Sequence, residues 1–314
     1  MKAVYISKYG HAEQLTLGSI AQPTITSNQV LIKVHGAGVN PVDWMVREGY
    51  LQDVTNHQLP LVLGWDAAGE VVQVGADVEN LTVGDSVFVY APIAEQGAYA
   101  EYIAVDSTIV AFKPKTLDTL TAAAVPLAGT TAWQSIMQGC ELKAGDKVLI
   151  HNAAGGVGSF AVQIAKACGA YVIGTASGAK KDYVKNLGVD EFIDYQTQRF
   201  EDVVNDVDAV LAAIGGDDIL TRSLNVIRKG GYLVSLLDEL TEFDTEIVEQ
   251  KEVNFTHWWV TPNSADLNSI AQLIDDGKIK VNINSIFPLK DAAKAHALSE
   301  STRTQGKIVL NAQA

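Results

Sequence analysis

Three glycines fall within four residues of the segment HNAAGGVGSF, residues 151–160. A run typical of a buried strand, KVLIHN (147–152), leads into it, and a run typical of a helix, GVGSFAVQIAKACG (156–169), overlaps its end. Glycine at a strand-to-helix turn permits positive φ and lets a diphosphate approach the main chain, while the helix N-terminus offers unpaired N–H groups. Ala153 takes the first glycine position of the G-x-G-x-x-G pattern. The sequence therefore predicts a pyrophosphate-binding loop formed by Ala154, Gly155, Gly156, Val157 and Gly158.

The next predicted strand, YVIGTA (171–176), ends without the Asp or Glu that usually binds a ribose 2′-hydroxyl. It is followed by Ser177, Lys180 and Lys181. A carboxylate here would repel a 2′-phosphate by about 4 kcal/mol at ~4 Å and an effective dielectric constant of ~20. A hydroxyl and lysines reverse that preference, so the sequence predicts NADP(H). Which lysine meets the phosphate stays open, as does the alternative that both only begin a solvated helix.

Alternating strands and helices surround the glycine loop. Strands are expected over residues 147–152, 171–176, 191–195, 208–214, 231–237 and 253–259, with helices over 156–169 and 180–188. Alternation of this length is typical of a doubly wound, parallel α/β sheet, the Rossmann arrangement.

The first third of the chain is instead rich in short strands, which favours a small barrel or sandwich. Residues 121–137 have a helical pattern in which Pro126 marks a kink or a first turn. Two more helices, 264–277 and 287–301, precede a last strand, 306–310. We infer a β-rich domain of residues 1–124 and 263–314 and an inserted dinucleotide-binding domain of residues 125–262.

Composition narrows the class of protein. The 314 residues exceed one typical core, and the formal charge of −14 argues against a nucleic-acid surface. No apolar run reaches the ~18 residues of a membrane span, and the N-terminus lacks the features of a signal or transit peptide. Cys140 and Cys168 are too few for a disulfide framework. We expect a cytoplasmic protein.

Five segments together resemble the zinc-free quinone oxidoreductase branch of the medium-chain dehydrogenase/reductase superfamily, along the whole chain. They are residues 36–50, 60–85, 126–133, 148–177 and 306–310. The resemblance implies a GroES-like first domain, a Rossmann domain, an active site in the cleft between them, and a homodimer formed by the edges of the Rossmann sheets.

Zinc alcohol dehydrogenases of this superfamily differ at their metal ligands. They have cysteine where this chain has Asn40, a His-Glu pair where it has Trp65 and Asp66, and a cysteine near residues 127–128. Residues 91–102 also contain none of the cysteines of a structural zinc lobe. Because zinc requires three such ligands and an open position, we expect no metal, with Trp65 and Asp66 filling its space.

Quinones and α,β-unsaturated carbonyl compounds accept hydride without a Lewis acid, because hydrogen-bond donors suffice for their delocalised developing charge. The resemblance places Asn40 beside the nicotinamide and Tyr50 in the substrate cleft, both as hydrogen-bond donors, and Thr130 near the nicotinamide. Whether Tyr50 orients the acceptor oxygen or delivers a proton to it stays open. The alternatives are that Asn40 with Pro41 forms a plain turn and that Tyr50 is a loop aromatic residue.

The resemblance also assigns cofactor contacts on the Rossmann side. Tyr195 would lie near the adenine or the 2′-phosphate. Ile214 and Leu236 would flank the nicotinamide ribose, and Trp259 and Val260 would pass under the nicotinamide, although aromatic residues in a strand often belong to the core.

The sequence thus favours an NADPH-dependent oxidoreductase that reduces a quinone or an enone, with a small molecule as substrate and neither nucleic acid nor membrane as a partner. A 2-enoyl thioester reductase is the alternative within the same class, although it would need basic residues for the phosphates of its substrate. A non-catalytic NADPH-binding redox sensor or scaffold is the alternative of another class.

Overall fold

The computed structural model describes residues 1–216 and 218–314 and divides into two compact units. Unit 1 contains Met1–Thr130, Thr261–Asp276 and Val281–Ala314, and unit 2 contains Thr131–Val260 and Gly277–Lys280. These units are defined by packing, and the functional domains expected from the sequence stay a prediction. Within the described ranges, no helix is both long and apolar enough to cross a membrane.

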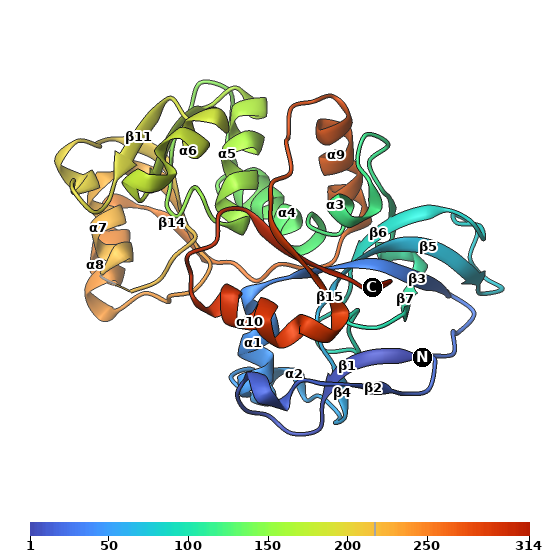
Figure 1. Ribbon diagram of the computed structural model, residues 1–314. Helices are drawn as coiled ribbons and strands as arrows, with labels where there is room; N and C mark the ends of the chain where they lie inside the picture. The colour runs from blue at the N-terminus through green and yellow to red at the C-terminus, as the bar shows by residue number, and fades with distance from the viewer. Residues whose placement is uncertain (217) are drawn as a thin grey trace. The chain divides into compact units, whose positions relative to one another are not determined.

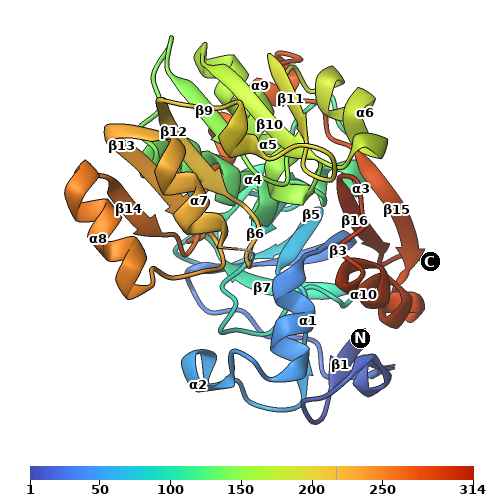
Figure 2. The ribbon, with the colours of Figure 1, turned by 90° about the vertical axis from the view of Figure 1, so that its left-hand side faces the viewer.

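Unit 2 is built on a six-stranded sheet in the order β11-β10-β9-β12-β13-β14, of which β11 and β14 are labelled in Figure 1 and every strand in Figure 2. Each neighbouring pair in it is parallel. Counted from β9 as the first strand, the order is 3-2-1-4-5-6, that of dinucleotide-binding sheets. The predicted parallel, doubly wound sheet is therefore confirmed. The strands are β9 (Lys147–Ile150), β10 (Tyr171–Ala176), β11 (Glu191–Asp194), β12 (Val207–Ala212), β13 (Ile227–Ser235) and β14 (Asn254–His257).

Helices cover this sheet. The main ones are α5 (Gly156–Cys168), α6 (Lys181–Asn186), α7 (Ile219–Val226) and α8 (Glu242–Lys251). Helix α5, expected over 156–169, ends at Cys168, and its C-cap is Gly169, which has φ of 90°. The sequence analysis did not identify α7 and α8, which lie side by side next to β13 (Figure 2). Their apolar residues complete a core with Leu149, Val210 and Leu233 of the sheet.

Unit 1 has the β-rich fold that was expected. One sheet runs β15-β16-β3-β5-β6-β8, with β7 also paired to β3, and a smaller sheet runs β2-β1-β4. The strands are β1 (Lys2–Ile6), β2 (Thr16–Ser19), β3 (Gln29–Val39), β4 (Leu61–Val62), β5 (Asp66–Val74), β6 (Ser86–Tyr90), β7 (Tyr102–Asp106), β8 (Ala111–Phe112), β15 (Ile283–Pro288) and β16 (Lys307–Asn311).

The helices of unit 1 exclude one alternative and correct one expectation. Pro41 does not form a plain turn with Asn40 but begins a helix, because proline suits a first helical position. The helix expected over 287–301 begins at Ala292, since Phe287 and Pro288 end the edge strand β15, where proline is tolerated. The helices are α1 (Pro41–Glu48), α2 (Gln52–Thr55), α3 (Thr119–Ala122), α9 (Ser264–Asp275) and α10 (Ala292–Glu300), and α4 (Pro126–Trp133) continues into unit 2.

Strand β3 lies between β16 and β5, and this pairing positions the site. Ile308 of β16 pairs with Val39, and Asp66 of β5 pairs with Gly38. A Cβ atom on Gly38 would lie 2.7 Å from the Asp66 carboxylate, so the close approach of the two strands requires glycine there. The pairing thus brings together the end of β3, the start of β5 and the start of β16.

Candidate active site

The predicted residue Asn40 caps α1 and is buried, with 2% of its surface exposed. Its backbone N–H donates to Asp43 Oδ2 over 2.8 Å. Its side chain donates from Nδ2 to Asp66 Oδ2, also over 2.8 Å, and its Oδ1 accepts a hydrogen bond from Lys307 Nζ. Asn40 therefore lies in a buried polar cluster that sequence reasoning had only partly identified.

Asp66 and Lys307 form an ion pair within that cluster. Lys307 Nζ lies 3.7 Å from Asp66 Oδ2 and donates to the Val39 carbonyl oxygen over 3.2 Å. Asp66 Oδ1 accepts from the Leu127 N–H over 2.6 Å, which ties the start of α4 to β5. Burial raises the pKa of Asp66 and lowers that of Lys307, and the attraction between the two charges opposes both shifts.

The residues at the ligand positions of the zinc enzymes do not fit zinc. Asn40 offers an amide, and the buried Trp65 donates its indole N–H to the Glu95 carbonyl oxygen over 3.0 Å. Of these three residues only Asp66 has a carboxylate that could bind a metal ion, and both of its oxygens already accept hydrogen bonds. Among the described residues no group of three or more His, Cys, Asp or Glu could hold a metal ion.

Asp43 is fully buried beside this cluster. Its Oδ2 accepts from the Tyr99 hydroxyl over 2.7 Å, whereas its Oδ1 has no hydrogen-bond partner among the described residues. Burial raises the pKa of Asp43 to about 7, against the opposing effect of the donors Asn40 and Tyr99. A carboxyl group that titrates near neutral pH therefore lies at the base of α1.

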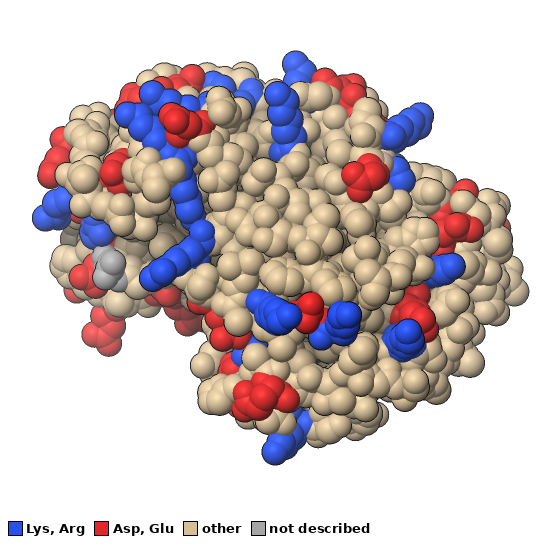
Figure 3. All heavy atoms as spheres, viewed as in Figure 1, with Lys and Arg blue, Asp and Glu red and all other residues tan. Residues whose placement is uncertain are grey.

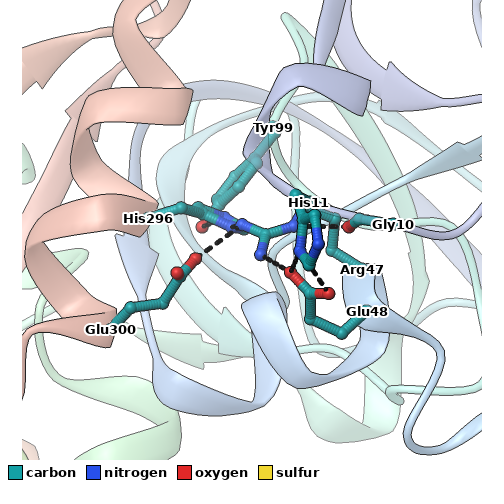
Figure 4. Close-up of polar contacts among 7 residues, drawn as sticks. All are labelled: Gly10, His11, Arg47, Glu48, Tyr99, His296 and Glu300. Atoms are coloured by element: carbon teal, nitrogen blue, oxygen red, sulfur yellow. Dashed lines mark hydrogen bonds and ion pairs between the residues drawn. The ribbon is translucent and has the colours of Figure 1, made fainter.

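The last turn of α1 is held by the buried guanidinium group of Arg47 (Figure 4). It donates to the Gly10 carbonyl oxygen over 3.0 Å and to Glu300 Oε1 over 2.8 Å. Arg47 also contacts Nδ1 of His296 at 3.1 Å, and Nε2 of that ring lies 3.3 Å from the Tyr99 hydroxyl. Burial and Arg47 lower the pKa of His296 to about 3, so the neutral ring accepts from Arg47 and donates to Tyr99. This network fixes α1 to α10.

The other predicted residues of this unit differ in exposure. Tyr50 follows Gly49, the residue that ends α1, and is 71% exposed. Its ring packs edge-on against Trp44, with 6.1 Å between the ring centroids. Thr130 in α4 is fully buried, and its hydroxyl has no hydrogen-bond partner among the described residues. Tyr50 can therefore meet a ligand from solvent, and Thr130 has an unused hydrogen-bonding group.

In unit 2 the glycine loop has the geometry of an anion-binding turn. Asn152 adopts φ of 54° and accepts the Gly155 N–H over 2.9 Å, and α5 begins at Gly156. A Cβ atom on Gly158 would overlap the Asn152 carbonyl oxygen, so this approach requires glycine. The 13-residue α5 presents its free N–H groups and positive dipole end at the loop, as binding of a diphosphate requires. Asn152 was missed, although asparagine is a common residue at positive φ.

The remaining predicted cofactor residues follow the carboxyl ends of the other strands. Since parallel strands end at one edge of a sheet, these residues share that edge with the glycine loop, where doubly wound sheets bind ligands. Three of them expose large apolar side chains: Tyr195 at 61%, Ile214 at 42% and Trp259 at 57%. The positions are Ser177 after β10, Tyr195 after β11, Ile214 after β12, Leu236 after β13, and Trp259 and Val260 after β14.

The two predicted lysines are not equivalent. Lys180 is half-buried, which lowers its pKa, whereas Lys181 is exposed. Sequence reasoning missed Asp194 nearby, which pairs with Ala176 across β10 and β11. A Cβ atom on Gly178 would lie 2.5 Å from Asp194 Oδ2, so this carboxylate borders the turn that carries Ser177. The available signal was its place in the strand expected over 191–195, because that strand neighbours 171–176 in a doubly wound sheet.

Comparisons with known proteins identify the family. Residues 26–115 match the alcohol dehydrogenase GroES-like domain, and residues 187–310 match the zinc-binding dehydrogenase family. The chain is 38% identical to the chloroplastic NADPH-dependent alkenal/one oxidoreductase of Arabidopsis thaliana, over 99% of this chain and 79% of that protein. It is 35% identical to the solved quinone oxidoreductase of Coxiella burnetii, with a TM-score of 0.92 over 99% of both chains. The chain belongs to the zinc-free quinone oxidoreductase branch of the medium-chain dehydrogenase/reductase superfamily.

A further member of this quinone oxidoreductase branch has been solved with a cofactor. The Escherichia coli quinone oxidoreductase complexed with NADPH is 28% identical to this chain, with a TM-score of 0.88 over 99% of this chain and 100% of that one. The resemblance found in the sequence is therefore confirmed.

Proposed function

We propose that this quinone oxidoreductase-like chain is an enzyme that transfers a hydride from NADPH to a quinone or an α,β-unsaturated carbonyl compound. The observation that carries the proposal is the glycine loop and the N-terminus of α5 at the carboxyl edge of a 3-2-1-4-5-6 sheet. The names of the Arabidopsis and Coxiella relatives support the choice of acceptor.

Unit 2 supplies the groups that bind the cofactor. NADPH supplies the hydride when bound. The backbone N–H groups of residues 154–158 hold its pyrophosphate, and Ser177 with Lys180 and Lys181 holds the 2′-phosphate. The exposed Tyr195, Ile214 and Trp259, with Leu236 and Val260, cover the adenosine and nicotinamide ends.

Unit 1 supplies the groups that act on the acceptor. The Tyr50 hydroxyl and the Asn40 side-chain amide donate hydrogen bonds to the acceptor oxygen as negative charge develops on it. The unused Thr130 hydroxyl orients the nicotinamide. The reaction proceeds without a metal ion, since Asn40, Trp65 and Asp66 form no zinc site.

Rates of NADPH oxidation test the proposal directly. Initial rates are measured with simple quinones, alkenals, enones and enoyl thioesters, each with NADPH and with NADH. We expect turnover with quinones and with alkenals or enones, and at least tenfold tighter binding of NADPH than of NADH, about 1.4 kcal/mol. Activity confined to enoyl thioesters would show that the protein is a 2-enoyl thioester reductase and not a quinone or enone reductase. Tight NADPH binding without any turnover would indicate a redox sensor or a scaffold.

We also propose a cytoplasmic homodimer whose sole other partner is the small-molecule substrate. Strand β14 lies at an edge of the sheet in unit 2, and an edge strand has backbone groups able to pair with a second copy. The net charge of −14, and the interspersed acidic and basic side chains on the face in Figure 3, oppose binding to nucleic acid. Light scattering should give twice the chain mass of 33.6 kDa.

A further inference from the structure

Lys307 is a buried cation that the proposed function has not used. It begins β16 and is 3% exposed. Its Nζ donates to the Val39 carbonyl oxygen over 3.2 Å and to Asn40 Oδ1, and it lies 3.7 Å from Asp66 Oδ2. An ammonium group has three hydrogens, and three residues present oxygen atoms to it here. The strand pairing thus holds the amino group of Lys307 against the Asn40 side chain.

This arrangement fixes which way the Asn40 amide points. A lysine ammonium group can only donate hydrogen bonds, and an ionised Asp66 can only accept them. Asn40 must therefore turn Oδ1 toward Lys307 and Nδ2 toward Asp66, as the two contacts show. A reversed amide would lose both hydrogen bonds and would turn Nδ2 toward the ammonium group and Oδ1 toward the carboxylate, which are repulsive contacts.

The same contacts strengthen Asn40 as a donor. A charge-assisted hydrogen bond to Oδ1 polarises the amide, and hydrogen bonds linked in this way reinforce one another. One N–H of Nδ2 donates to Asp66. The amide carries a second N–H, which is the one that the proposed function offers to the acceptor oxygen.

We propose that Lys307 is a positioning residue of the reaction, which stabilises the developing negative charge on the acceptor oxygen through the Asn40 amide. This inference rests on the proposed function. The amino group of Lys307 contacts both Asn40 and Asp66, so it places a cation next to the amide that donates to the acceptor oxygen.

The test compares Lys307→Met, which keeps the side-chain length and removes the charge, with the wild-type enzyme. We expect kcat with an alkenal to fall about tenfold, because a charge-assisted hydrogen bond is roughly twice as strong as a neutral one. With a quinone, whose developing charge is more delocalised, we expect a loss of about threefold. The dissociation constant for NADPH should stay within about twofold, because the residues proposed to hold its pyrophosphate and 2′-phosphate lie in unit 2.

A matched control uses a lysine of the same unit. Lys294 is paired with Asp291 at 2.9 Å, and its side chain is 70% exposed. Lys294→Met makes the same chemical change away from Asn40, so it should leave both rates unchanged.

A second variant separates positioning from folding. Lys307→Met leaves Asp66 buried without its cation, which destabilises the fold. The double variant Lys307→Met with Asp66→Asn removes both charges and should recover much of the lost thermal stability, while kcat with the alkenal stays low. Equal losses on the alkenal and the quinone, or a wild-type kcat in the double variant, would overturn the role of Lys307. A wild-type enzyme inactive with every acceptor would instead refute the proposed function.

Discussion

The buried carboxyl group of Asp43 should make the stability of unit 1 depend on pH in a particular direction. Its pKa is raised from the usual 3.8 to about 7, chiefly by burial. Between these values the folded protein keeps a proton that the unfolded chain has released. The unfolded state therefore binds fewer protons, and the stability contributed by Asp43 falls as the pH rises. This contribution is complete below the unfolded pKa and is lost as the pH passes the folded pKa.

The size of the effect follows from the shift. Each pH unit inside the window changes the free energy of unfolding by about 1.4 kcal/mol, so about 2 to 3 kcal/mol is lost from about pH 5 to about pH 7. Two buried histidines act in the opposite direction. Burial lowers the pKa of both His151 and His296 to about 3. Below their unfolded pKa the unfolded chain binds protons that the folded protein does not, so the stability that they contribute falls as the pH falls. The free energy of unfolding measured against pH combines these effects, and the difference between wild type and an Asp43 variant isolates Asp43.

Asp43→Asn provides that difference, because asparagine keeps the size of the side chain and one acceptor for the Asn40 N–H. Urea unfolding of both proteins is followed between about pH 5 and about pH 8 by tryptophan fluorescence and circular dichroism, which must give coincident transitions. The stability of the wild type relative to the variant should fall by about 2 to 3 kcal/mol and level off above about pH 7. A difference that is constant, or that grows with pH, would refute the buried, protonated state of Asp43. Tyr99→Phe removes a hydrogen-bond donor that favours the ionised carboxylate of Asp43, so it should raise the pKa of Asp43 further. The pH range over which stability falls should then extend to higher pH.

Four further outcomes test the site. Gly158→Ala should weaken NADPH binding at least tenfold in fluorescence titration, because the new Cβ atom overlaps the loop backbone; unchanged binding would show that the loop holds no diphosphate. Lys180→Met should raise the dissociation constant for NADPH about tenfold and leave that for NADH unchanged, and equal effects on both would remove Lys180 from the 2′-phosphate site. Tyr50→Phe should lower kcat and kcat/KM together by about 5- to 50-fold, whereas an unchanged kcat would make Tyr50 a loop residue. Elemental analysis should find no stoichiometric zinc, and activity should persist in chelator; one zinc per chain, with activity lost on its removal, would contradict the metal-free assignment.

The parts of this fold that depend on local pattern could be predicted from the sequence. Alternating strand and helix signals gave the parallel sheet, and the glycines at residues 155–158 marked the turn between β9 and α5. Local reasoning failed where one signal has two structural meanings. Asn40 and Pro41 suit a turn and a helix start equally well, so α1 was missed.

The charged cluster could not be predicted, because its members are far apart in the chain. Asn40 and Lys307 are 267 positions apart, and Arg47 and His296 are 249 positions apart. Their contacts follow from the pairing of β16 with β3 and from the packing of α10 on α1, neither of which leaves a local signal. The GKIVL segment was identified through the resemblance, but its lysine gains a function only once the strand register is known.

The place of β16 in the sheet has a consequence for biosynthesis. A ribosome releases β3 and β5 long before residues 307–311, and all of unit 2 is made between them. Until β16 arrives, residues 36–39 of β3 lack the strand that pairs with them there and Asp66 lacks its counter-ion, so unit 1 cannot complete its sheet before unit 2 has been synthesised. A nascent chain can therefore assemble its nucleotide-binding unit early, but it cannot complete the cluster around Asn40 until translation has passed Lys307.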